Sequence, residues 1–150
     1  MKIHADKIEN GPRHTLSHRA VRLILKEVPP KWKVGIQEVH ISNSLEWRGG
    51  LACAFFSRYD GCLTIYSRKA TTEQALHAVL SELAAISLRI DKGLRRRPKA
   101  VQDGLSKVIA PLMQTLLPLV HSKSDIQRRV SLEGFRELHF APIPNDSERE

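Results

Sequence analysis

Residues 71–90 read TTEQALHAVLSELAAISLRI, and this stretch decides the expected fold. Its large apolar side chains recur three or four positions apart: Leu76, Val79, Leu80, Leu83, Ile86 and Ile90. That spacing predicts a helix over 72–91 with a wide buried face. Thr71 and Gln74 form a capping-box pattern at its start, and Gly93 is expected to end it in a left-handed cap.

A second long helix is predicted downstream. Pro98 suits the first position of a helix, and an apolar stripe follows it. The members of this stripe are Val101, Leu105, Val108, Ile109, Leu112, Leu116 and Val120. Pro111 should kink this helix or split it in two. Ser124 and Gln127 then predict a capping box for a short basic helix that runs to about Phe135.

A first helix and a strand are predicted upstream. Helical spacing over 13–27 puts apolar residues on one side, and Pro29-Pro30 stops the helix. Its polar side carries Arg19, Arg22 and Lys26. Alternating apolar residues then predict a strand over 32–41. The apolar phase slips by one residue on the way, so we expect a bulge near Gln37-Glu38.

A β-hairpin is predicted next. Segments 51–57 and 62–67 are rich in apolar and aromatic residues, and Asp60-Gly61 between them is a strong short-range turn pattern. Cys53 and Cys62 flank this turn. Two interpretations stay open for them, a disulfide across the hairpin or two small core residues.

These elements predict an α+β fold in one domain of 150 residues. We expect a leading helix, a small, mostly antiparallel three-stranded sheet, two long helices and a short C-terminal helix. Residues 1–12 would be a lead-in, 13–135 the folded core and 141–150 a flexible tail. Since residues 1–15 have no apolar core and no run reaches membrane-spanning length, we expect no membrane partner and a cytoplasmic location.

The net charge of +8 is uneven along the chain, and its densest basic block lies between the two long helices. The block consists of Arg89, Lys92, Arg95, Arg96, Arg97 and Lys99, diluted by Asp91. Such a block favours a nucleic acid or another polyanion as a partner. The alternative is a solvated helix end and loop without a partner.

The centre of the 72–91 helix, Ser81-Glu82-Leu83-Ala84-Ala85, resembles the active-site helix of zincin metalloproteases of the small gluzincin type. That family has a leading helix, a small sheet, and a helix with His-Glu-x-x-His, whose histidines bind zinc and whose glutamate is the general base. Here Ser81 and Ala85 replace the histidines, and only Glu82 is kept. The resemblance therefore implies the fold but argues against the activity, so we expect no metal and no cofactor there.

Weaker candidate sites lie elsewhere. His14 and His18 are four residues apart and are interpreted as surface histidines rather than metal ligands. His77 and Ser81 have the same spacing, without an acid or an oxyanion hole to complete a nucleophile system. A base-stacking platform would combine Phe55, Phe56 and Tyr66 with the flanking Arg58 and Arg68. The alternative is that these aromatic residues are core and cross-strand pairs.

The expected function is a non-enzymatic, degenerate zincin-like module that binds a protein or a nucleic acid. Glu82 is a vestigial catalytic candidate in this interpretation, and the basic block is the anion-binding surface. Two alternatives stay open. One is a hydrolase with an unrecognised site around Glu82 or His77, and the other is a basic nucleic-acid-binding protein without zincin ancestry.

Overall fold

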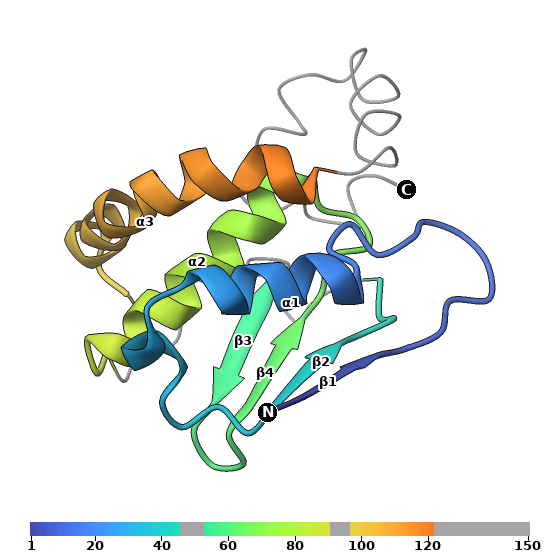
Figure 1. Cartoon of the computed structure of the whole chain (residues 1–150), viewed down its shortest axis with the longest axis horizontal. Helices are drawn as coiled ribbons and strands as arrows, with labels where there is room; N and C mark the ends of the chain where they lie inside the picture. Colours follow the sequence, from blue (N-terminus) through green and yellow to red (C-terminus); the bar gives the residue numbers. More distant parts are fainter. Residues whose placement is uncertain (46–52, 91–96, 122–150) are drawn as a thin grey trace.

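The computed structural model describes residues 1–45, 53–90 and 97–121, and these form an α+β domain (Figure 1). The elements in order are β1 (Lys2–Ala5), α1 (His18–Glu27), the 3-10 helix η1 (Pro30–Lys33), β2 (Glu38–Ile41), β3 (Ala54–Ser57), β4 (Cys62–Ile65), α2 (Thr72–Ser87) and α3 (Lys99–Val120). The predicted fold class and the two long helices are confirmed. The expected short helix up to 135 and the tail 141–150 lie outside the described residues.

Within the described residues the sheet has four strands in the order β1-β2-β4-β3. β1 pairs with β2 and β2 with β4 in parallel, while β3 and β4 are antiparallel. The prediction of a three-stranded, mostly antiparallel sheet is therefore wrong. β1 lies inside the expected lead-in, and α1 carries the chain back across the sheet, so β1 and β2 run in the same direction.

The helices cover one face of the sheet (Figure 1). α2 packs against β3, η1 and α3, and α1 packs against β1 and α3. Alternate residues of the two central strands point into this core: Val39, Ile41, Leu63 and Ile65. From α2, Leu76, Val79, Leu80 and Leu83 meet them, and none is more than 1% exposed. The predicted apolar stripe of α2 is thus the centre of the core.

α1 begins at His18, five residues later than predicted. The hydroxyl of its N-cap Ser17 accepts a hydrogen bond from the N–H of Ala20. The residues before it bond to distant parts of the chain instead of to the helix. Thr15 donates to the carbonyl of Ala70, and the N–H of Leu16 donates to the hydroxyl of Ser67. These long-range partners compete with helical hydrogen bonds, which the local sequence pattern does not show.

The predicted strand over 32–36 is wrong. Pro30–Lys33 forms η1 with a proline at its start, and Gly35 follows with a φ of +88°. A strand would put Trp32, Val34 and Ile36 on one face, but Trp32 and Ile36 are buried and Val34 is 69% exposed. The apolar spacing over 32–36 therefore belongs to a tight turn rather than to a strand. β2 begins only at Glu38, which leaves no bulge at that position.

The predicted hairpin is confirmed. Ser57 is paired with Cys62 across β3 and β4, Gly61 has a φ of +69°, and the Asp60 carboxylate accepts from the N–H of Cys62. Cys53 and Cys62 are both free cysteines. The register explains this, because the carbonyl of Cys53 accepts from the N–H of Tyr66 at the far end of the hairpin. The disulfide alternative is therefore wrong.

α2 has the predicted capping box between Thr71 and Gln74, but it ends at Ser87. Arg89 takes the left-handed conformation, with a φ of 56°. Its N–H donates to the carbonyl of Ile86 at 3.1 Å, and the N–H of Ile90 donates to Ala85 at 3.0 Å. This is a Schellman motif with an arginine where glycine is usual. Gly93, the predicted cap, lies outside the described residues.

α3 is one continuous helix that contains Pro111 and Pro118, so of the two outcomes predicted for Pro111, a kink or a split, the split does not occur. In Figure 1 its first part is seen nearly end-on and its second part lies across the view, so the helix bends, as a proline in its interior explains. Pro98 is the N-cap rather than the first helical residue. Of the helices in the described residues, none is long and apolar enough to span a membrane.

Replacing Leu83 with alanine should lower the free energy of unfolding by about 2–5 kcal/mol, because its side chain is fully buried. Leu88→Ala is the matched control, since Leu88 is 55% exposed at the end of the same helix and should change stability by less than about 0.5 kcal/mol. Urea unfolding followed by circular dichroism measures both. Equal losses for the two variants would contradict the central position of α2.

Replacing Arg89 with glycine should stabilise the protein by roughly 0.5–1 kcal/mol, because glycine adopts a positive φ without steric cost. Arg89→Ala is the control. It removes the same charge but keeps the Cβ, so it should bring no gain. Thermal unfolding of the three proteins separates the two effects. An equal gain for alanine and glycine would mean that the gain comes from removing the charge and not from relieving backbone strain.

Candidate functional site

α2 carries the segment that resembles a zincin active site, and the structure buries all three of its key positions. Ser81, Glu82 and Ala85 are no more than 6% exposed. The hydroxyl of Ser81 lies 3.5 Å from Nδ1 of His77, and Ala85 offers no ligand atom. Within 1–45, 53–90 and 97–121, the one group of three potential metal ligands lies elsewhere.

Glu82 forms a buried ion pair with Arg97. One carboxylate oxygen lies 3.2 Å from the guanidinium, and the two side chains are 8% and 2% exposed. The carboxylate also accepts a hydrogen bond from the backbone N–H of Phe56 in β3. Glu82 thus joins three separate parts of the chain, namely α2, the edge strand β3 and the segment that leads into α3.

Burial raises the pKa of Glu82, because a carboxylate loses its hydration in the core. The positive charge of Arg97, together with the hydrogen bonds from Phe56 and Arg97, acts in the opposite direction. A general base must reach the proton that it removes. Glu82 faces a guanidinium and a backbone N–H instead, so its chemistry here is charge pairing within the core.

His77 belongs to α2, and its side chain faces α3. Its Nε2 is 3.2 Å from the hydroxyl of Ser106, and its Nδ1 faces Ser81. Desolvation lowers the pKa of His77 more than the charge of Glu73 raises it, which favours the neutral ring. The hydrogen-bond partners of this ring are two hydroxyls. Such an arrangement joins the helices and lacks the acid that orients the base of a nucleophile system.

The predicted basic block is only partly described, and one member departs from the prediction. Arg89 and Lys99 are exposed, whereas Lys92, Arg95 and Arg96 lie outside the described residues. Arg97 is 6% exposed and pairs with Glu82, so it lies in the interior rather than on the expected anion-binding surface. The sequence pattern predicts Arg97 as part of the exposed basic block. A partner 15 residues away in sequence could not be read from that pattern.

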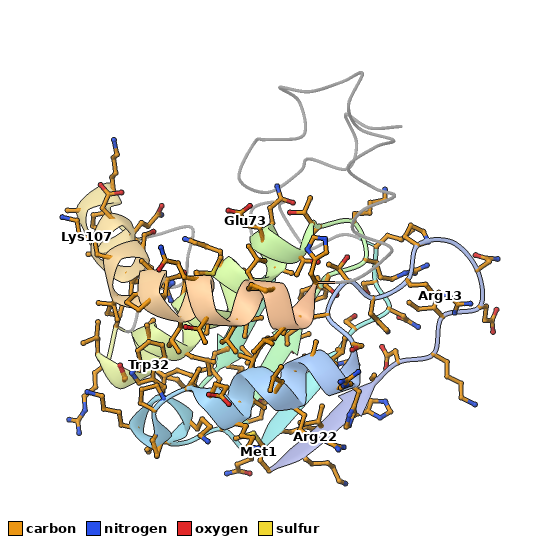
Figure 2. The ribbon with its side chains drawn as sticks, turned by 45° about the horizontal axis from the view of Figure 1, so that its top comes forward. Met1, Arg13, Arg22, Trp32, Glu73 and Lys107 are labelled. Carbon is orange, nitrogen blue, oxygen red and sulfur yellow. The ribbon has the colours of Figure 1, made fainter. Side chains whose placement is uncertain are left out.

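Exposed cations from several elements gather at one end of the molecule. Figure 1 shows the last turns of α1 and α2, η1 and the start of α3 together there, and α2 packs against η1. Figure 2 places Trp32 of η1 and Lys107 of α3 at this end and Arg13 at the opposite one. We call this surface the basic end; its exposed members are Lys26, Lys31, Arg89, Lys99 and Lys107.

The predicted aromatic platform loses one of its two arginines. Arg68 is buried and donates to three backbone carbonyls, those of Asn10, Pro12 and Asn43, at 2.6–2.8 Å. It therefore fixes the loop before α1 instead of facing a phosphate. Arg58 is exposed and donates to the carbonyl of Ile90. Of the aromatic side chains, Phe55 is 39% exposed.

The histidine pair at 14 and 18 does not share a helix face. His14 precedes α1, and its Nε2 lies 2.8 Å from the carbonyl oxygen of Asp6. His18 begins α1, with its Nδ1 3.4 Å from the guanidinium of Arg22. Both side chains are half-buried rather than fully exposed, so the prediction of two surface histidines holds only in part.

A cluster of His4, Asp6 and His40 was not predicted from the sequence. Nε2 of His40 lies 2.9 Å from Oδ1 of Asp6, and Nε2 of His4 lies 3.3 Å from the same oxygen. The two imidazoles stack with their centroids 5.7 Å apart. His4 and His40 are direct partners in the parallel register of β1 and β2. The strand pairing brings together two histidines that are 36 positions apart in the sequence. The local sequence pattern of this cluster is limited to His-x-Asp at 4–6.

Replacing Arg97 with methionine should destabilise the protein by about 3–5 kcal/mol at neutral pH, because it leaves a buried carboxylate without its cation. A carboxylate with a raised folded pKa stabilises the fold most below its unfolded value near 4.5, and this contribution is lost as the pH rises through the folded value. Arg97→Met raises that pKa further. The stability gap to the wild type should therefore widen from pH 4 to pH 8, as measured by urea unfolding.

The control is the same Arg97→Met change made in a Glu82→Gln background, where no carboxylate can titrate. The effect of the methionine should then be independent of pH. A gap that widens equally in both backgrounds would show that another group titrates and that the Glu82–Arg97 pair does not control the pH dependence.

Comparisons with protein-family models, with curated proteins and with solved structures found no match to this chain. Its function is therefore inferred from its own residues.

Proposed function

We propose that this protein is a non-enzymatic, degenerate zincin-like module that binds a nucleic acid through its basic end. The observation that carries the proposal is the buried pair between Glu82 and Arg97. The one residue that keeps its zincin identity serves the core, so the function is sought on the surface. There the net charge of +8 favours a polyanion.

The zincin-like part of the proposal rests on the order of elements. A leading helix, a small sheet, a helix with Glu82 and a further long helix follow one another, as the resemblance implies, although β1 precedes them. Glu82 lies beside the edge strand, where it accepts the N–H of Phe56. The two positions where that family has histidines hold the buried Ser81 and Ala85, which supports the loss of metal chemistry at this helix.

The basic end suits phosphate groups, because exposed cations from four elements lie at this end of the molecule. Lys31 is the second residue of η1, and Lys99 is the first residue of α3. Arg89 follows the end of α2. Lys33 is not included, because its ammonium group donates to the carbonyl of Leu25 and serves the end of α1. Arginine and lysine side chains held on rigid helix ends bind phosphates with little sequence preference.

The hydrolase alternative has weaker support. Its two candidate bases make separate contacts, Glu82 with Arg97 and Phe56, and His77 with Ser81 and Ser106. The other alternative is a basic nucleic-acid-binding protein without zincin ancestry. It predicts the same result in the binding test below, because that test does not depend on ancestry.

The triple variant Lys31→Ala/Arg89→Ala/Lys99→Ala should bind a generic DNA duplex and a single strand at least tenfold more weakly than the wild type at low salt. Because each lost phosphate contact reduces the dependence of log K on log salt by about 0.7–0.9, the slope should fall by roughly 2–3. Fluorescence anisotropy at several salt concentrations measures both quantities.

The matched control is Lys2→Ala/Lys7→Ala/Arg13→Ala, which removes the same charge from exposed positions outside the basic end. It should keep most of the affinity and of the salt slope. Equal losses in both variants would mean that net charge alone is responsible and that the basic end is not the binding surface. If the wild type binds neither probe, the nucleic-acid proposal is wrong and a protein partner becomes the better one.

A further inference from the structure

We propose that His4, Asp6 and His40 form a binding site for a divalent first-row transition metal, for which Zn²⁺ is the natural probe. The site lies at the β1 edge of the sheet and is independent of Glu82 and of the proposed nucleic-acid binding. The sequence pattern alone predicted no metal site, because the three residues come together only through the pairing of β1 with β2.

The donor atoms lie near the separations that a metal requires. With metal–ligand bonds of about 2.0–2.2 Å, two ligands of a tetrahedral ion are roughly 3.3–3.6 Å apart. Oδ1 of Asp6 is 3.3 Å from Nε2 of His4 and 2.9 Å from Nε2 of His40. One ligand atom from each of the three residues lies within 4.8 Å of the others, so a closure of about 1.5 Å or less completes the geometry.

Two imidazoles and one carboxylate are a donor set that suits Zn²⁺ and its neighbours in the first transition row. The set supplies three ligands, and the side chains of His4, His40 and Asp6 are 61%, 33% and 22% exposed. A bound ion would therefore keep at least one position open toward solvent. Water or a donor atom from a partner molecule would fill it.

Surrounding hydrogen bonds hold the carboxylate in place. Oδ2 of Asp6 accepts from the N–H of Asn43, which leaves Oδ1 directed at the two histidines. The backbone of Asp6 is fixed as well, since its N–H donates to Ile41 and its carbonyl oxygen lies 2.8 Å from Nε2 of His14. Such outer contacts orient metal ligands and reduce the reorganisation that binding requires.

The register of the parallel strands holds the two imidazoles side by side. His4 and His40 are direct partners, and their rings stack at an interplanar angle of 30°. Without a metal, the hydrogen bond with His40 is the main contact that lowers the pKa of the Asp6 carboxyl group, and the N–H of Asn43 acts in the same direction. A metal that replaces the shared protons would connect β1, a strand of four residues, to β2 and to the loop after Asp6.

Isothermal titration of the full-length, tag-free protein with Zn²⁺ at pH 7.5 tests the proposal. The wild type should bind one ion at this site, and Co²⁺ in its place should give the visible absorption of a low-symmetry complex with nitrogen and oxygen ligands. His4→Ala, His40→Ala and Asp6→Asn should each weaken binding at least tenfold. His4 is largely exposed, so His4→Ala should keep the circular dichroism spectrum and melting temperature of the metal-free protein.

His18→Ala is the matched control. It removes a histidine that contacts Arg22 outside the cluster and should leave the affinity unchanged. Zn²⁺ should also raise the melting temperature of the wild type but not that of His4→Ala, because a ligand of the folded state stabilises it. The proposal is overturned if His4→Ala binds as tightly as the wild type, if the wild type binds no ion, or if His18→Ala weakens binding as much as His4→Ala does.

Discussion

The ion pair between Glu82 and Arg97 is the interaction on which the arrangement of α2, β3 and α3 depends. A buried carboxylate and a buried guanidinium each carry a large desolvation cost, so neither is stable in the core without the other. Arg97 directly precedes α3, and the N–H of Phe56 completes the contacts of the carboxylate. One side chain of α2 thereby contacts both the edge of the sheet and the segment that leads into the last described helix.

The same pair gives Glu82 a structural contact in the core. Glu82 lies beside the edge strand β3, and its carboxylate faces the guanidinium of Arg97. The two surfaces that we propose for binding lie away from Glu82. Exposed cations gather at the basic end, and two histidines with an aspartate meet across β1 and β2. These two surfaces use different elements of the fold.

Local patterns predicted the elements whose hydrogen bonds are local. The capping box and apolar stripe of α2 and the Asp-Gly hairpin are examples, because each depends on residues that are close together in the sequence. The predictions failed where distant partners decide the structure. β1 is stable only beside β2, the residues before α1 bond to Ser67 and Ala70, and Arg97 is buried because Glu82 is. The His4–Asp6–His40 cluster was missed for the same reason.

The most direct measurement of the central claim is an NMR titration of the Glu82 side-chain carboxyl carbon in the wild type and in Arg97→Met. If the guanidinium pairs with this carboxylate in the folded protein, the Glu82 carboxyl group of the variant will have a clearly higher pKa than that of the wild type, because desolvation then acts without an opposing charge. The same pKa in both proteins would mean that Glu82 faces solvent or another partner, and that the Glu82–Arg97 pair does not hold α2, β3 and α3 together.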